Sequence, residues 1–193
     1  SVSGVQTCAL PIYHVGTAGG NSAQLAAAGG ANVVVFDKRQ DRLAEMMALG
    51  ANVTALYPYE EYVAREVRDA DLVIGAVLIP SAKAPHVVTE AMVRTMAPGS
   101  VMVDISVDQG GCFETTRPTT YADPTYDVHG VTHFAVTNMP GAVPRTSSEA
   151  ICAAILPYVN RLASGNWRDH VPLARGINVE AGRLVHPALQ GMV

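Results

Sequence analysis

The chain has 193 residues, enough for one domain with an appendage, and 49% of them are hydrophobic, which permits a sizeable core. Its net charge is -4 and it has no basic stripe, so nucleic acid is not expected as a partner. No apolar run reaches the roughly 20 residues of a membrane span, and no signal-peptide pattern is present. The 3 cysteines lack metal-ligand spacing, which favours reduced thiols in the cytoplasm and no metal site.

The first twelve residues look foreign to the rest of the chain. Residues 4–12 can be back-translated into a common sequencing-library adapter. We therefore expect residues 1–12 to be a non-native translation, fused in frame to a truncated gene. The alternative is a natural strand that contains Cys and Pro. Under the first interpretation the first strand of the fold is damaged, since Pro11 lacks the N–H that a central strand needs.

From Tyr13 onward, strand-like and helix-like segments alternate. The strand-like segments are apolar almost throughout, which is typical of a parallel sheet buried on both faces. This order predicts an α/β fold, a Rossmann-like doubly wound parallel sheet with helices on both faces. The expected strands are 32–36, 52–57, 71–77, 101–106 and 133–136, and the expected helices are 21–28, 40–49, 59–69 and 87–96.

The pattern changes after Pro144. The four residues 146–149, Thr-Ser-Ser-Glu, have the form of a capping box and would open a long apolar helix that runs to Leu162. An irregular segment and a small hairpin within 176–186 would follow. We place a boundary near Thr146, so that 13–146 is a dinucleotide-binding domain and 147–193 a C-terminal helix and hairpin.

A glycine turn, then a helix, then an acid at a strand end about 20 residues later form the dinucleotide fingerprint. Here the turn is 16–19, Gly-Thr-Ala-Gly, and the acid is Asp37. The glycines let the backbone approach the pyrophosphate, and the helix start supplies free N–H groups. His14 stands where the pattern has its first glycine, and a side chain there would crowd the pyrophosphate. The alternative is an ordinary tight turn in another α/β fold.

Asp37 also bears on the choice of cofactor. A carboxylate that accepts hydrogen bonds from the ribose hydroxyls would repel the 2′-phosphate of NADP, so NAD is favoured. Lys38, Arg39 and Arg42 lie close by in sequence and could soften that preference, or they could form a solvated basic face.

A second carboxylate follows a strand-like run. The stretch from Val101 ends at Asp108, and Gly110 and Gly111 come directly after. Ligands bind at the carboxyl ends of strands in open parallel sheets, so this places Asp108 beside a ligand. The alternative role for Asp108 is to cap the glycine turn, as Asp commonly does. We expect Cys112 and Cys152 to be small buried side chains.

Three stretches, 70–85, 104–118 and 136–146, closely resemble alanine dehydrogenase, and with the glycine turn the resemblance covers residues 16–167. The α subunit of proton-translocating transhydrogenase shares the first stretch and part of the second. It is disfavoured by 117–121 and 136–146. A non-catalytic NAD-binding module is the remaining alternative, and the intact protein's activity would then not depend on Asp108.

The resemblance implies which residues bind NAD and which one is catalytic. The family's catalytic aspartate matches Asp108. A departure stands at Pro58 or Tyr59, where the family has an adenosine-contacting Ser. The implied cofactor-binding residues are Gly16, Thr17, Ala18, Gly19, Asp37, Arg42, Val77, Leu78, Ile105, Ser106, Val107, Asp108, Val136, Thr137, Asn138 and Met139.

The implied reaction is the reversible, NAD-dependent oxidative deamination of L-alanine to pyruvate and ammonia, in a homo-oligomer. In the family, the substrate-binding Arg and Lys and the catalytic His lie in an N-terminal domain. The segment after Thr146 packs back on that domain. We therefore expect these 193 residues to be inactive alone and to expose an apolar helix.

Overall fold

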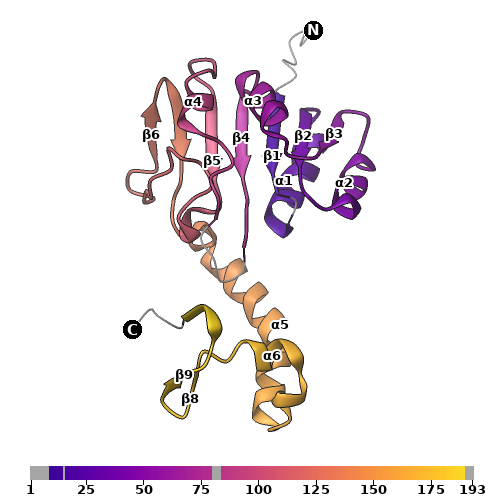
Figure 1. Ribbon diagram of the computed structural model, residues 1–193, viewed down its shortest axis with the longest axis vertical. Coiled ribbons are helices and arrows are strands. Elements are labelled where there is room, and N and C mark those ends of the chain that lie inside the picture. The colour runs from indigo at the N-terminus through magenta and orange to yellow at the C-terminus, as the bar shows by residue number, and fades with distance from the viewer. Residues whose placement is uncertain (1–8, 15, 80–83, 190–193) are drawn as a thin grey trace. The chain divides into compact units, whose positions relative to one another are not determined.

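The computed structural model describes residues 9–14, 16–79 and 84–189. The chain separates into two compact units, residues 1–138 and residues 139–193. The helices and strands are labelled in Figure 1.

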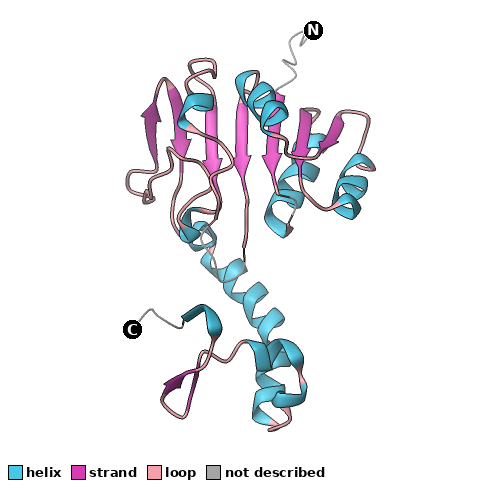
Figure 2. Cartoon of the chain, in the orientation of Figure 1, coloured by secondary structure: helices cyan, strands magenta, loops and turns pink. Residues whose placement is uncertain are grey.

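The first unit is built on a seven-stranded sheet with the order β3-β2-β1-β4-β5-β7-β6. Figure 2 draws strands in magenta and helices in cyan. Every neighbouring pair is parallel except β6 and β7. The predicted doubly wound α/β fold is confirmed. The strands are β1 (Ala9–Tyr13), β2 (Asn32–Phe36), β3 (Val53–Leu56), β4 (Leu72–Gly75), β5 (Val101–Asp104), β6 (Thr125–Val128) and β7 (Val131–Phe134). The α-helices are α1 (Thr17–Ala28), α2 (Gln40–Met47), α3 (Glu60–Arg68) and α4 (Glu90–Val93).

The core has two layers, one on each face of the sheet, because successive strand side chains point to opposite faces. Ile12 and Val35 pack with Ala23 of α1 in one layer. The next residues along the two strands, Tyr13 and Phe36, stack their rings with centroids 5.1 Å apart in the layer beneath α3 and α4. Helices therefore cover both faces of the sheet.

The direction in which successive strands are added to the sheet reverses between β1 and β4. The chain builds outward from β1 through β2 to β3, then crosses to β4 on the other side of β1. The loops that leave the carboxyl ends of β1 and β4 therefore run to opposite sides and leave a crevice between them, the usual ligand position in such sheets. This switch point positions the candidate site.

Part of the segment predicted to be an adapter translation forms β1, while residues 1–8 lie outside the described residues. The carbonyls of Ala9 and Tyr13 accept hydrogen bonds from the first residues before and after β4. Because backbone direction alternates along a strand, Pro11 faces β4 as well, and its missing N–H falls on that side. Pairing of β1 with β4 is accordingly limited to Ile12 and Tyr13, whereas pairing with β2 runs along the whole strand.

Two elements differ from the sequence prediction. The helix expected at 87–96 is shortened to α4, because the preceding chain is extended: Val88 pairs with Phe113, and the Thr89 hydroxyl accepts the Met92 N–H to begin the helix. The edge strand β6 was not predicted. Its signal was the dipeptide His129-Gly130, whose φ angles of 56° and 81° form a two-residue hairpin turn into β7.

The second unit consists of helical segments and one small hairpin. The hairpin, β8 (Val179–Glu180) and β9 (Arg183–Leu184), confirms the expectation for 176–186. The predicted capping box is wrong: α5 (Pro144–Ala163) begins before Thr146, and Glu149 pairs with Arg145. The remaining elements are η2 (Met139–Ala142), η3 (Trp167–Asp169), α6 (Val171–Arg175) and η4 (Pro187–Leu189). Within the described ranges, no helix is both long enough and apolar enough to cross a bilayer.

Candidate functional site

Two cavities adjoin at the carboxyl edge of the sheet, at the switch point between β1 and β4. The smaller, of about 240 Å³, contains Asp37, and the larger, of about 380 Å³, contains Asp108. His14, Val77 and Leu78 line both, so the two cavities meet along the loops after β1 and β4. The larger cavity brings together eight of the predicted site residues: Gly16, Thr17, Ala18, Val77, Leu78, Ile105, Ser106 and Asp108.

The glycine turn is built for close approach of backbone. Gly16 caps α1 with no side chain of its own, and the first N–H groups of a helix have no partner within the helix. Gly19 is buried, and a Cβ on it would lie 2.2 Å from the carbonyl oxygen of His14. Gly19 therefore lets the helix pack against the turn and lines neither cavity.

His14 occupies a glycine-like position. Its φ of 66° lies in the left-handed region that side chains disfavour, which explains why the fingerprint has glycine there. His14 lines both cavities, and Nδ1 of its imidazole lies 3.4 Å from an oxygen of Asp37. The side chain expected to crowd a pyrophosphate thus lies at the junction of the two cavities.

Asp37 is held rigidly at the end of β2. It is 3% exposed, and its carboxylate accepts the backbone N–H of Arg39 at 2.8 Å. Lys38 and Arg39 also line the smaller cavity. Arg42 lies on α2, outside both linings, where its guanidinium binds Glu45 at 2.5 Å.

Asp108 lies on the turn η1 (Val107–Gln109) and is exposed to the larger cavity. Both of its carboxylate oxygens are 3.2 Å from the backbone N–H of Asn138, which donates to them. The structure therefore brings Asn138 to Asp108 from 30 residues away. Val107 and Val136 are buried in the core and Thr137 is exposed, and these three line neither cavity. Met139 begins the second unit.

The buried Cys112 confirms the expectation of a small core side chain, but Cys152 is exposed on α5, so that expectation was wrong. Burial, followed by the nearby Asp104 carboxylate, raises the pKa of the Cys112 thiol well above its usual range. Cys112 is therefore a thiol at neutral pH and unsuited to act as a nucleophile.

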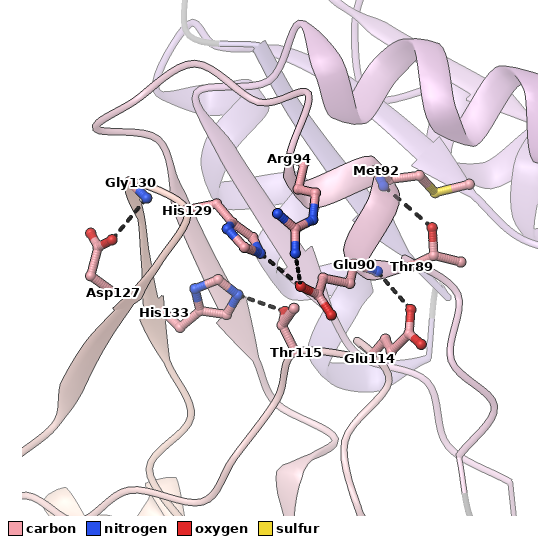
Figure 3. Close-up of polar contacts among 10 residues, drawn as sticks. All are labelled: Thr89, Glu90, Met92, Arg94, Glu114, Thr115, Asp127, His129, Gly130 and His133. Carbon is pink, nitrogen blue, oxygen red and sulfur yellow. Dashed lines mark hydrogen bonds and ion pairs between the residues drawn. The ribbon is translucent and has the colours of Figure 1, made fainter.

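A polar cluster lies away from both cavities, around the turn between β6 and β7 (Figure 3). Glu90 accepts hydrogen bonds from His129 at 2.8 Å and Arg94 at 2.5 Å, and these contacts lower the pKa of its carboxyl. His133 donates from Nδ1 to a backbone carbonyl, so its Nε2 accepts the hydroxyl proton of Thr115 at 2.8 Å. Burial lowers the pKa of His133. These contacts tie the β6–β7 hairpin to the helix and loop beside it.

Comparisons with known proteins agree with this geometry. The family described as "Alanine dehydrogenase/PNT, C-terminal domain" matches residues 1–187. The chain belongs to this family. It is 49% identical to the alanine dehydrogenase of Geobacillus stearothermophilus and 44% identical to that of Mycolicibacterium smegmatis, in each case over 97% of the chain and 52% of the relative.

Solved structures show the same relationship. An L-alanine dehydrogenase structure superposes with a TM-score of 0.83 at 45% identity, covering 94% of this chain and 51% of that one. A transhydrogenase from Sinorhizobium meliloti superposes with a TM-score of 0.71 at 28% identity, covering 93% of this chain and 49% of that one. The chain therefore spans about half the length of the relatives it matches.

Proposed function

We propose that this chain is the NAD-binding part of an L-alanine dehydrogenase, which reversibly converts L-alanine, NAD and water to pyruvate, ammonia and NADH. The observation that carries the proposal is the pair of adjoining cavities, one with the buried Asp37 and the other with Asp108, in a chain of this family. The higher identity to alanine dehydrogenases than to the transhydrogenase favours this reaction over the alternative.

The residues present fit a dinucleotide. The pyrophosphate would lie over the start of α1, where Gly16 leaves free N–H groups and the helix dipole favours an anion. Asp37 would accept the ribose hydroxyls in the smaller cavity, and the nicotinamide end would lie near Ile105 and Asp108 in the larger one. His14 opposes this fit, because it lines both cavities where the fingerprint has a glycine.

When bound, NAD would accept the hydride from the carbon that carries the amino group. This chain's contribution is to orient and to shuttle protons. Asp108 lines the larger cavity. It would exchange a proton with the nitrogen of the imine, or with the oxygen or nitrogen of the carbinolamine. The N–H of Asn138 keeps its carboxylate in place.

We further propose that the two halves of the relatives supply different parts of the active site. The substrate-binding and remaining catalytic groups would come from the half of the relatives that this chain does not match, and residues 147–193 would pack against that half. The 193 residues alone would then bind NADH but not oxidise alanine.

The first test is a titration of the 193-residue chain with NADH and NADPH, followed by nucleotide fluorescence. We expect tighter binding of NADH, and weaker NADH binding with a narrower gap to NADPH in Asp37→Ser. His14→Gly should strengthen NADH binding, and Asp41→Asn on α2 is the matched control that should change nothing. Equal affinities for both nucleotides in the unaltered chain, or no binding of either, would refute the proposed site.

The second test assays alanine-dependent formation of NADH. The chain alone should give none, and a protein that joins it to the half of the relatives that it does not match should be active and lose its activity with Asp108→Asn. An active longer protein that is indifferent to this substitution would instead favour the non-catalytic module.

A further inference from the structure

One buried carboxylate organises the loop that carries Asp108. Asp104 ends β5, is 2% exposed, and accepts hydrogen bonds at both oxygens. Oδ1 accepts the N–H of Ser106 at 2.8 Å, and Oδ2 accepts the N–H of Cys112 at 2.8 Å and the hydroxyl of Thr116 at 2.5 Å. A longer contact of 3.4 Å joins Oδ2 to the N–H of Phe113.

The two shortest hydrogen bonds from backbone N–H groups to Asp104 hold the two ends of a single loop. Ser106 and Cys112 bracket the turn η1, and between them the N–H of Gly111 donates to the carbonyl of Ser106 at 3.1 Å. Gly111 has a φ of 79°, and a Cβ on it would lie 2.5 Å from Cγ2 of Thr116 and 3.0 Å from Oδ2 of Asp104. The loop is therefore folded tightly against Thr116 and the carboxylate that it contacts, and the positive φ and these short distances require glycine.

Part of this loop lines the larger cavity. Asp108 and Gln109 line it from the turn, and Ile105 and Ser106 line it from the first end of the loop. Asp104 itself is not among the lining residues, so its influence on a ligand passes through the loop. Because one side chain fixes both ends, a change in its hydrogen bonding would move the loop relative to β5.

We propose that Asp104 is a positioning residue that sets where Asp108 stands. This inference rests on the proposed function. Through Asp108, Asp104 would shape the nicotinamide half of the dinucleotide site and leave the adenosine half unaffected. Asp104 is suited to this because an ionised carboxylate accepts at both oxygens. An Asn of the same shape accepts at only one, and its NH₂ would face an N–H of Ser106 or Cys112 and push it away.

The test compares Asp104→Asn with the unaltered chain, using NADH and AMP as probes. NADH spans both cavities, whereas AMP carries only the adenosine end. We expect Asp104→Asn to weaken NADH binding by roughly tenfold, with AMP affinity changed by less than about twofold. Equal weakening of both ligands, or no change in either, would overturn the positioning role.

A readout without nucleotide separates this inference from the proposed function. Amide hydrogen exchange at Asn138 reports whether Asp108 still holds that N–H. We expect faster exchange at Asn138 in Asp104→Asn even if the chain binds no NADH, which would refute only the proposed function. Unchanged exchange at Asn138 would overturn the role of Asp104.

Three further variants guard against the case in which Asp104→Asn fails to fold. Thr116→Val removes one hydrogen bond to Asp104 and should act in the same direction more weakly, whereas Thr116→Ser keeps the hydroxyl and should match the unaltered chain. Asp127→Asn is the control for the chemical change, because Asp127 holds the N–H of Gly130 at 2.8 Å in the β6–β7 turn (Figure 3). If Thr116→Val leaves both NADH binding and Asn138 exchange unchanged, the inference fails.

Discussion

The two units of the chain satisfy their apolar residues in opposite ways. The first unit encloses a core on both faces of its sheet, where Tyr13, Phe36 and Phe113 are each 1% exposed. In the second unit, by contrast, none of the described residues is buried. Its exposed apolar side chains include Ile151, Ile155, Leu156, Tyr158, Val159 and Leu162 of α5.

The contrast shows that a segment can form regular secondary structure without contributing to a buried core. α5 is 20 residues long and makes its backbone hydrogen bonds between residues close in sequence, apart from its interior Pro157, which has no N–H, so it can form without burying its side chains. A parallel sheet cannot, because each strand needs neighbours that are distant in sequence. We therefore expect the first unit to account for most of the free energy of unfolding of the chain. The second unit is expected to need contacts with groups outside that unit to bury its apolar side chains.

The largest expected difference between the units is the cost of removing one apolar side chain. Phe113→Ala empties a site in the core and should lower the free energy of unfolding by about 3–5 kcal/mol. Ile155→Ala on α5 should change it by less than about 0.5 kcal/mol, because Ile155 is 47% exposed. Urea unfolding followed by circular dichroism measures both, and similar costs for the two variants would break the comparison.

A smaller effect is expected from pH, and it belongs to the first unit alone. Burial lowers the pKa of His133 below its ordinary value of 6.5, so the unfolded chain binds the proton more readily than the folded one. This contribution to stability is complete above pH 6.5 and is lost as the pH falls through the lowered pKa. Protonation would also convert Nε2 from an acceptor to a donor toward Thr115.

Unfolding of His133→Gln between pH 7 and pH 5 tests this. The variant should lose less stability on acidification than the unaltered chain, whereas His86→Gln, at an exposed histidine, should follow the unaltered chain. An identical pH dependence in His133→Gln would show that the buried imidazole is not responsible.

The sequence was sufficient to predict features that depend on local pattern. The apolar strands, the glycine turn and the acid at the end of β2 could all be located, because strand periodicity and turn chemistry are written in neighbouring residues. Contacts between distant segments could not be located in this way. Two such contacts are the hydrogen bond from the Cys112 N–H to Asp104 and the one from the Asn138 N–H to Asp108. Each depends on the folding of a loop that no short sequence pattern encodes.

The short α4 shows the same limit. Its segment has helical spacing, but the pairing of Val88 with Phe113 holds the preceding residues extended. Tertiary pairing thus overrode a local preference. The exposure of Cys152 has a related cause, since α5 has an apolar sequence but none of its residues is buried.

The smallest effect is expected from the most drastic change, removal of residues 139–193. If the first unit owns the core, a chain that ends at Asn138 should unfold at the same urea concentration and bind NADH as tightly as the full 193 residues. It should also self-associate less, because the exposed apolar residues of α5 are gone. Sedimentation and NADH titration of the two chains provide the measurement. A marked loss of stability on truncation would mean that the second unit supports the sheet after all.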